Sequence, residues 1–231
     1  TGTGVLTLGD SDTGLTVAGD LLVGGTSTGA ISLGDATLAD GVTLTAGTGA
    51  ANQIDLDAVA GTASGAVSNL TINTTGVATV AEAVGTDFGT VTITQSGGTT
   101  FSSTLTAATL AITDTADSQA VSLTGNVTLT TGLTTANGGS DNYNVSLTGG
   151  TNSIAGATTF NQGGTLTLGD GADATDFVGG LVATAPSSIS AQGTVKADTG
   201  TGVLTLGDGD TGLAVAGNLL VGGTSTGAIS L

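Results

Sequence analysis

Residues 1–33 read TGTGVLTLGDSDTGLTVAGDLLVGGTSTGAISL, and residues 199–231 read TGTGVLTLGDGDTGLAVAGNLLVGGTSTGAISL. Position 1 corresponds to position 199, so the sequence repeats with a period of 198 residues. The copies differ at three positions, which are Ser11 against Gly209, Thr16 against Ala214, and Asp20 against Asn218. Tandem copies of this kind are typical of proteins whose units stack on one another. We therefore expect one full unit over residues 1–198 and the start of the next over residues 199–231, continuous and without a linker, within a longer array.

Inside this long period, short strings in which apolar and polar residues alternate recur along the chain. The clearest strings are Leu6–Leu8, Ile31–Leu33, Val42–Leu44, Ile54–Leu56, Leu70–Ile72, Val91–Ile93, Leu110–Ile112, Val127–Leu129, Val145–Leu147, Leu166–Leu168 and Leu204–Leu206. Alternation with a period of two indicates a strand with one buried face. Gly, Asp and Asn fill the gaps between the strings and favour turns. The pattern predicts an all-β protein.

Two all-β architectures fit the period of the sequence. Stacked coils of about 20 residues would form a β-solenoid, with roughly ten coils in each 198-residue unit. Two sandwich domains of about 99 residues would also fill the period, but the two halves of the unit do not resemble each other. Sandwich cores usually contain bulky aromatic residues, whereas this chain has only four Phe and one Tyr. We therefore favour a parallel β-solenoid.

Composition excludes several other classes of protein. The chain lacks Cys, His, Met and Trp, and its only basic residue is Lys196. A formal net charge of −17 opposes binding to nucleic acid, because phosphate backbones require clusters of Lys and Arg. No apolar run approaches the roughly 18 residues of a membrane-spanning helix. The hydrophobic fraction of 38% is enough to form a core and argues against disorder.

One stretch of the sequence is a candidate for metal binding. Residues 169–176 place Asp170, Asp173 and Asp176 close together between glycines. Calcium prefers cages of carboxylate and carbonyl oxygens, so these three residues are our candidate ligands for Ca²⁺. The spacing is similar to Gly- and Asp-rich calcium-binding nonapeptides, although the nine-residue period is not sustained. The alternative is that these Asp residues only form turns with their own backbone. No cofactor is required by either interpretation.

Catalysis and ice binding are weaker interpretations of other motifs. The closely spaced carboxylates Asp10/Asp12, Asp55/Asp57 and Asp208/Asp210 suit general acid–base chemistry in principle, but two of these pairs lie in Gly-rich turns. Turn formation is therefore the favoured role of these Asp residues. Thr-x-Thr strings are irregularly spaced, which favours solvent-facing strands over an ice-binding surface. We predict that the chain is not an enzyme.

The strings Leu166-Thr167-Leu168-Gly169-Asp170 and Val42-Thr43-Leu44-Thr45-Ala46-Gly47 carry a family resemblance. The sequence resembles the giant repetitive surface proteins of bacteria, which include filamentous-haemagglutinin-like adhesins, autotransporter passenger segments, and biofilm or sheath matrix fibres. The resemblance covers the whole chain but rests on motifs that many solenoids share. It implies right-handed parallel coils, secretion, and a role in attachment or in a matrix. It supplies no catalytic residue.

These observations together predict a structural segment of a long extracellular fibre. We expect self-association into fibres or continuation in a longer chain, with divalent cations as further partners of so acidic a surface. An alternative is the stalk of a large secreted adhesin whose binding tip lies outside this segment. A more remote alternative is a carbohydrate-active β-helix enzyme.

Overall fold

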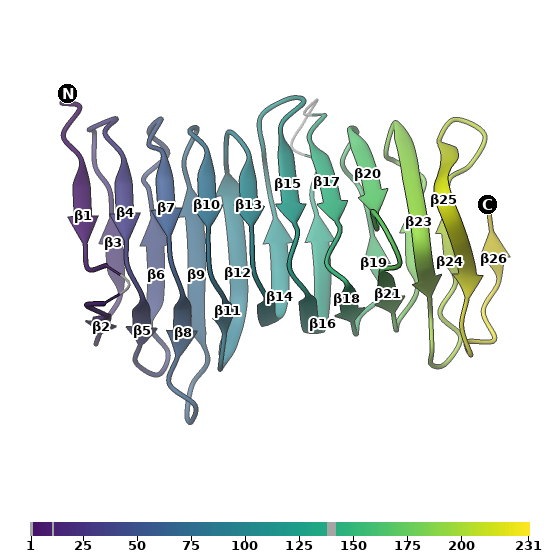
Figure 1. Ribbon diagram of the computed structural model, residues 1–231, viewed down its shortest axis with the longest axis horizontal. Coiled ribbons are helices and arrows are strands. Elements are labelled where there is room, and N and C mark those ends of the chain that lie inside the picture. The colour runs from purple at the N-terminus through teal and green to yellow at the C-terminus, as the bar shows by residue number, and fades with distance from the viewer. Residues whose placement is uncertain (1, 11, 138–141) are drawn as a thin grey trace.

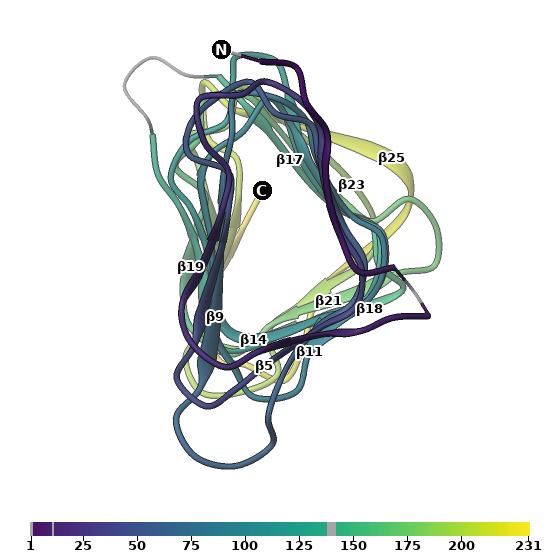
Figure 2. The same cartoon turned by 90° about the vertical axis from the view of Figure 1, so that its left-hand side faces the viewer.

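A computed structural model of the chain describes residues 2–10, 12–137 and 142–231. The chain winds through ten stacked coils into a rod, with its two termini at opposite ends (Figure 1). Viewed along the rod, the coils superpose as a three-sided prism (Figure 2). Each side of the prism is a parallel sheet, and we number these sides face 1, face 2 and face 3 in chain order. The prediction of an all-β parallel solenoid is confirmed.

Face 1 begins the coils and lies in front in Figure 1. Its strands are β1 (Leu6–Leu8), β4 (Ile31–Leu33), β7 (Ile54–Leu56), β10 (Ala78–Val80), β13 (Thr99–Phe101), β15 (Ala120–Leu123), β17 (Asn144–Leu147), β20 (Thr165–Leu168), and the first parts of β23 (Ser188–Lys196) and β25 (Gly212–Gly222). Nine coils separate Leu6 from Leu213 on this face, which makes a coil about 23 residues long. The coils are therefore slightly longer than expected, and ten of them occupy the whole chain.

Face 2 follows face 1 in each coil. Its strands are β2 (Leu15–Val17), β5 (Ala36–Leu38), β8 (Val59–Gly61), β11 (Val84–Gly85), the first parts of β14 (Leu105–Ile112) and β16 (Val127–Thr135), β18 (Thr151–Ile154), β21 (Ala174–Phe177), and the second parts of β23 and β25.

Face 3 completes each coil. Its strands are β3 (Leu21–Val23), β6 (Thr43–Ala46), β9 (Ser68–Asn73), β12 (Phe88–Gln95), the second parts of β14 and β16, β19 (Thr158–Thr159), β22 (Leu181–Ala183), β24 (Leu204–Leu206) and β26 (Ile229–Ser230).

Alternation along each strand builds the core. In β7, Ile54 and Leu56 are buried while Asp55 between them points outward, as the alternating string predicts. The parallel register places inward-facing aliphatic residues of successive coils above one another, so that Leu44 lies between Leu21 and Leu70 in one column. Burial of such a side chain stabilises the fold by about 1.5–3 kcal/mol. One coil alone has no second layer to bury these residues against, so stability comes from the contact between coils.

Turns at the corners of the prism bring backbone against backbone. At Gly125, a methyl group in place of hydrogen would lie 2.1 Å from the carbonyl oxygen of Ser103 in the coil before. At Gly149, one coil further on, it would lie 2.1 Å from the carbonyl oxygen of Gly125. These glycines are required by the spacing between coils, since parallel strands lie only about 4.8 Å apart. The largest excursion from a corner joins β8 to β9 and projects from the rod in Figure 2.

Candidate functional site

Side chains at several corners bind the backbone of the preceding coil. The Asn52 amide donates to the carbonyl oxygens of Ser27 and Gly29 at 2.8 and 2.6 Å. The Thr74 hydroxyl donates to the carbonyl oxygens of Ala50 and Asn52 at 2.9 and 2.5 Å. We call this contact with two carbonyls of the previous coil a corner clamp. The same contact is made by Ser27, Thr211 and Ser225.

Corner clamps have a clear physical role. They bind turn carbonyls, of which those of Gly2, Ala50 and Gly200 also accept a backbone N–H of the next coil. A net hydrogen bond contributes about 1 kcal/mol, and a Ser or Thr hydroxyl shares its one proton between the two carbonyls. Because every clamp joins two neighbouring coils, it also fixes the register between them. Sequence reasoning missed these residues, since Ser, Thr and Asn are common everywhere in the chain.

A polar step interrupts the aliphatic core on face 2. Asn152 and Thr175 occupy inward positions in adjacent strands and are both buried. The amide nitrogen of Asn152 donates to the Thr175 hydroxyl at 3.1 Å and to the carbonyl oxygen of Gly149 at 2.9 Å. Its amide oxygen accepts from the backbone N–H of Val127 at 3.0 Å. Every polar atom of the Asn152 side chain therefore has a partner.

The three predicted calcium ligands lie around one turn and one strand but have other partners. Asp170 and Asp173 belong to the turn before β21, and a carboxylate oxygen of Asp173 accepts from the backbone N–H of Asp170 at 2.7 Å and of Gly171 at 3.0 Å. Asp176 lies on β21, and its carboxylate oxygen Oδ2 is 3.8 Å from Nζ of Lys196. Among the residues described, no group of three or more acidic, His or Cys side chains is arranged to hold a metal ion. The calcium site stays a prediction.

Carboxylates elsewhere stabilise turns. Asp10 accepts from the backbone N–H of Asp12 and Thr13 at 3.1 and 2.6 Å. Asp208 accepts from the N–H of Asp210 and Thr211, both at 2.9 Å. These N–H groups lower the pKa of Asp208 below its usual value.

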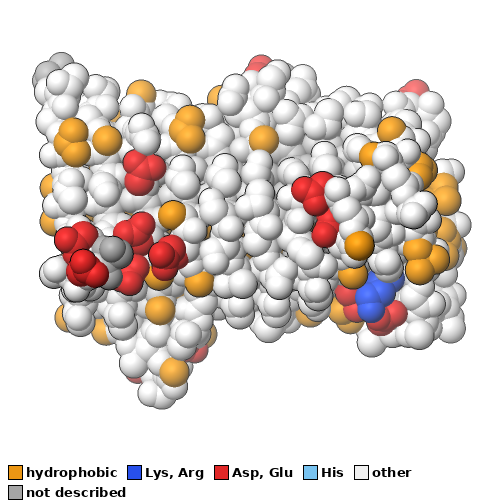
Figure 3. Space-filling model, in the orientation of Figure 1, with side chains coloured by type: hydrophobic (Ala, Val, Ile, Leu, Met, Phe, Trp, Pro, Cys, Tyr) orange, Lys and Arg blue, Asp and Glu red, His pale blue; other side chains and the backbone are white. Residues whose placement is uncertain are grey.

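Lys196 lies among acidic side chains on face 2. It contacts Asp198 directly and Asp176 more distantly (blue among red in Figure 3). The hydrogen bond to Asp198 raises the pKa of Lys196 and lowers the pKa of Asp198. Burial raises the pKa of Asp176, and the nearby Asp198 carboxylate raises it further. Because Lys196 and Asp198 are about a third exposed, the cluster adds little to stability.

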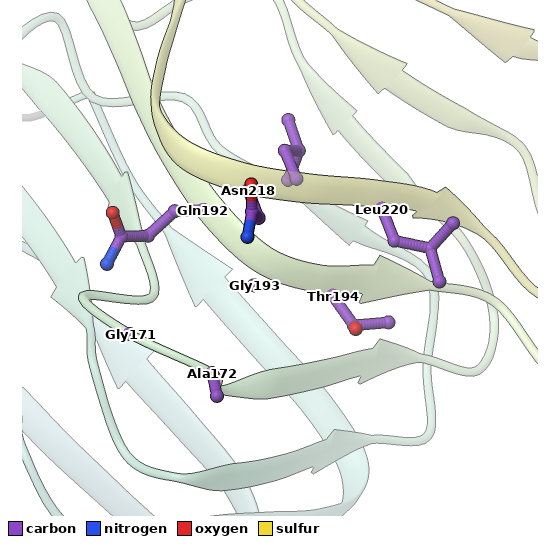
Figure 4. A pocket seen from close by; sticks show the side chains of 8 residues that line it. Gly171, Ala172, Gln192, Gly193, Thr194, Asn218 and Leu220 are labelled. Atoms are coloured by element: carbon purple, nitrogen blue, oxygen red, sulfur yellow. The ribbon is translucent and has the colours of Figure 1, made fainter.

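A shallow hollow of about 460 Å³ opens near the C-terminal end of the rod (Figure 4). It forms where the pairing of β23 with β25 shifts register between Ala191 and Gly193. Its lining consists of Gly171, Ala172, Gln192, Gly193, Thr194, Asn218, Leu219 and Leu220. None of these side chains titrates, so the lining offers hydrogen bonds and apolar contact but no acid or base.

Apolar side chains are exposed at the two ends of the rod. At the N-terminal end Leu6 is 40% exposed, and at the C-terminal end Val215 is 58% and Ile229 is 51% exposed. Strands at these ends have a neighbouring coil on one side only. Unpaired strand edges with exposed apolar residues are surfaces for association.

The chain matches no known family, no curated protein and no solved structure. The solenoid fold is shown by the structure alone, and the resemblance to bacterial surface fibres stays a prediction. Within the described residues no helix is present that is long and apolar enough to cross a membrane.

Proposed function

We propose that the chain is a structural segment of a long extracellular fibre of a cell surface, sheath or biofilm matrix. The observation that carries this proposal is the continuous parallel pairing from β1 to β26, which places the backbone hydrogen bonds along the length of the rod. Tension along the rod acts on the bonds of all three faces at each step. Ten coils at about 4.8 Å give a rod about 48 Å long, and tandem units lengthen it in proportion.

The proposal assigns no catalytic role to this segment. It is supported by the lining of the hollow near the C-terminal end, which contains no titratable side chain. It is also supported by the carboxylates of Asp10, Asp173 and Asp208, which bind backbone N–H groups of their own turns.

Antibodies against the purified chain test this function on the cells that produce it. Immunogold electron microscopy should show label along filaments outside the cell, and antibody first absorbed with the purified chain should give none. Label confined to the cell interior would overturn the proposal. Label along a shaft that ends in an unlabelled tip would assign the segment to the stalk of an adhesin.

The charge of the chain suggests how such fibres interact. A net charge of −17 over a rod of about 48 Å amounts to roughly one negative charge every 3 Å. Fibres should therefore repel one another in low salt and bundle when divalent cations bridge them. Light scattering with added Ca²⁺, followed by a chelator, measures this effect. If neither Ca²⁺ nor the chelator changes the scattering, divalent cations do not cause the bundling.

A further inference from the structure

The segment that occurs twice, at residues 1–33 and 199–231, keeps the order of its pairings at both ends of the rod, although residues 15–17 and 21–23 form two strands whose counterparts belong to the single strand β25. The Ser27 hydroxyl donates to the carbonyl oxygens of Gly2 and Gly4, and the Ser225 hydroxyl donates to those of Gly200 and Gly202. The pairing Leu6 with Ile31 recurs as Leu204 with Ile229. The two copies therefore share a corner contact and a strand pairing.

Each copy leaves uncovered the surface that the other copy buries. Val17 is 5% exposed beneath the next coil, whereas its equivalent Val215 is 58% exposed at the C-terminal end. Conversely, Leu6 is 40% exposed at the N-terminal end, whereas its equivalent Leu204 is 2% exposed against β22. Since the side chains are identical, the difference is caused only by the neighbouring coil.

The two copies lie on different faces of the prism. Leu6 is the first residue of its column on face 1, whereas Leu204 belongs to the ninth coil on face 3. The repeat of 198 residues thus advances by eight full coils and two further faces. In Figure 1, β1 lies in the front sheet and β24 lies behind it.

We propose that the C-terminal end, residues 213–231, is a stacking surface for a further coil with the sequence of residues 34–56, and that successive 198-residue units are turned relative to each other by one face. This inference deepens the proposed function and rests on it, because it supposes an array of such units. The occupant is identified by the first copy, where these same residues cover the equivalent surface.

The contacts of the first copy show how this coil fits. Ala36 pairs with Leu15, and Leu44 pairs with Leu21. The backbone N–H of Leu15 donates to the carbonyl oxygen of Asp35 at 2.6 Å, so its equivalent Leu213 has the same donor to offer.

The differences between the copies preserve this surface. Asp20 accepts from the backbone N–H of Thr43 in the next coil at 2.8 Å, and its replacement Asn218 keeps an oxygen able to accept that bond. Thr16 points to solvent, so its replacement Ala214 does not alter the stacking. The third difference, Ser11 against Gly209, falls at a position outside the described residues in the first copy.

The step by one face determines what a fibre presents to its surroundings. Each unit rises by about 42 Å, and three units close the cycle after 26 coils, about 125 Å. A repeated feature, such as the acidic turn at Asp10 and Asp208, appears at a different corner in each successive unit. An array therefore displays the same turn on all three sides and can meet neighbouring fibres in any direction.

Cysteine pairs in the full chain test the step between faces, and the natural sequence contains no Cys to interfere. Thr205 pairs with Val182 on face 3, and Ala214 pairs with Ser190 on face 1. Neighbouring strands lie within the range of Cα distances that a disulfide spans. Under mild oxidation, V182C/T205C and the control S190C/A214C should cross-link, whereas S190C/T205C should not. Cross-linking of S190C/T205C in place of V182C/T205C would show that the repeat returns to the same face and would overturn the step, while leaving a fibre role intact.

An extended chain tests the occupant. Residues 34–56 are added after Leu231, and a control chain carries the same added segment with inward and outward positions exchanged. Hydrogen exchange at the amides of Leu213 and Ile229 should slow by about tenfold or more in the extended chain only. Unchanged exchange, or equal slowing in the control, would show that the end does not recognise this coil.

Discussion

Substitution of Gly125 by Ala should separate two coils of the rod. The added methyl carbon would lie 2.1 Å from the carbonyl oxygen of Ser103. Contacts between carbon and a carbonyl oxygen need about 3.3 Å, so the coils must move apart locally by about 1 Å. The hydrogen bonds beside this corner, from Leu105 N–H to Asn126 and from Thr124 N–H to Phe101, are 2.9 and 3.0 Å long and would be stretched beyond their effective range.

The expected destabilisation follows from these two losses. Two weakened hydrogen bonds at about 1 kcal/mol each, with about 1–2 kcal/mol for overpacking, give about 3–4 kcal/mol. Urea unfolding followed by circular dichroism measures the overall effect, and hydrogen exchange at the amides of Leu105 and Thr124 localises it. Faster exchange should be concentrated at these two amides, since a solenoid transmits strain mainly to adjacent coils.

Gly132 provides the matched control for this substitution. A methyl group at Gly132 would meet its nearest atom, the Cα of Gly156, at an ordinary 3.8 Å. Gly132→Ala should leave stability unchanged or raise it by about 0.4–1 kcal/mol, because Ala reduces the freedom of the unfolded chain. Equal losses of stability in the two variants would refute the claim that the spacing between coils selects glycine at Gly125.

Three further predictions concern the core and the charged turns. Gln162 is fully buried, and neither of its amide atoms has a hydrogen-bond partner among the residues that the structure describes, so Gln162→Met should raise the unfolding free energy by about 1–3 kcal/mol. Asn152→Leu should lower it by about 2–4 kcal/mol, because it removes the amide that binds Val127 N–H and the Thr175 hydroxyl. Urea midpoints that fall in both variants would contradict this contrast. Leu70→Ala, in the core, should cost about 2–5 kcal/mol in thermal or urea unfolding. Leu220→Ala, at the exposed end, should cost only about 0.5 kcal/mol, and similar costs for the two would argue against a continuous core. Because the pKa of Asp208 is lowered in the folded state, its carboxylate stabilises the fold above the unfolded-state pKa of about 3.9, and that stability is lost as the pH falls through the folded-state pKa. The urea midpoint of Asp208→Asn should therefore fall less below about pH 4 than that of the natural chain. Identical pH profiles would exclude this turn as a source of acid sensitivity.

The strands were predictable where the sequence writes them as apolar pairs two residues apart. Ile54 with Leu56 and Leu166 with Leu168 are such pairs, and both form strands with those residues buried. The strand β19, Thr158–Thr159, lacks such a pair and could not be read from its own residues. It exists because β16 and β22 on either side supply its hydrogen bonds.

Coil length and the corner clamps depend on contacts between residues far apart in sequence. Asn52 binds carbonyl groups 23 and 25 residues earlier, and neither its type nor its neighbours distinguish it from the other Asn residues. The period of 198 residues can be read from the sequence. The number of strands, and so of faces, that one period covers depends on the lengths of the turns between strands. Only the pairing of whole coils determines that number.

The same pair of strands, Leu6 with Ile31 and Leu204 with Ile229, occurs on face 1 and on face 3. If only face 1 could hold this strand, Leu6 on face 1 and its copy Leu204 on face 3 would not both pair with the equivalent Ile of the next coil, Ile31 and Ile229. Faces 1 and 3 therefore both accept this pair of strands, and each strand is matched to the strand beside it in the next coil. Energies in such a rod are sums over adjacent coils. Insertion or deletion of one strand would then shift all later strands by one face and change only the contacts between the coils next to it. A repeat length that is not a whole number of coils is therefore compatible with a continuous rod.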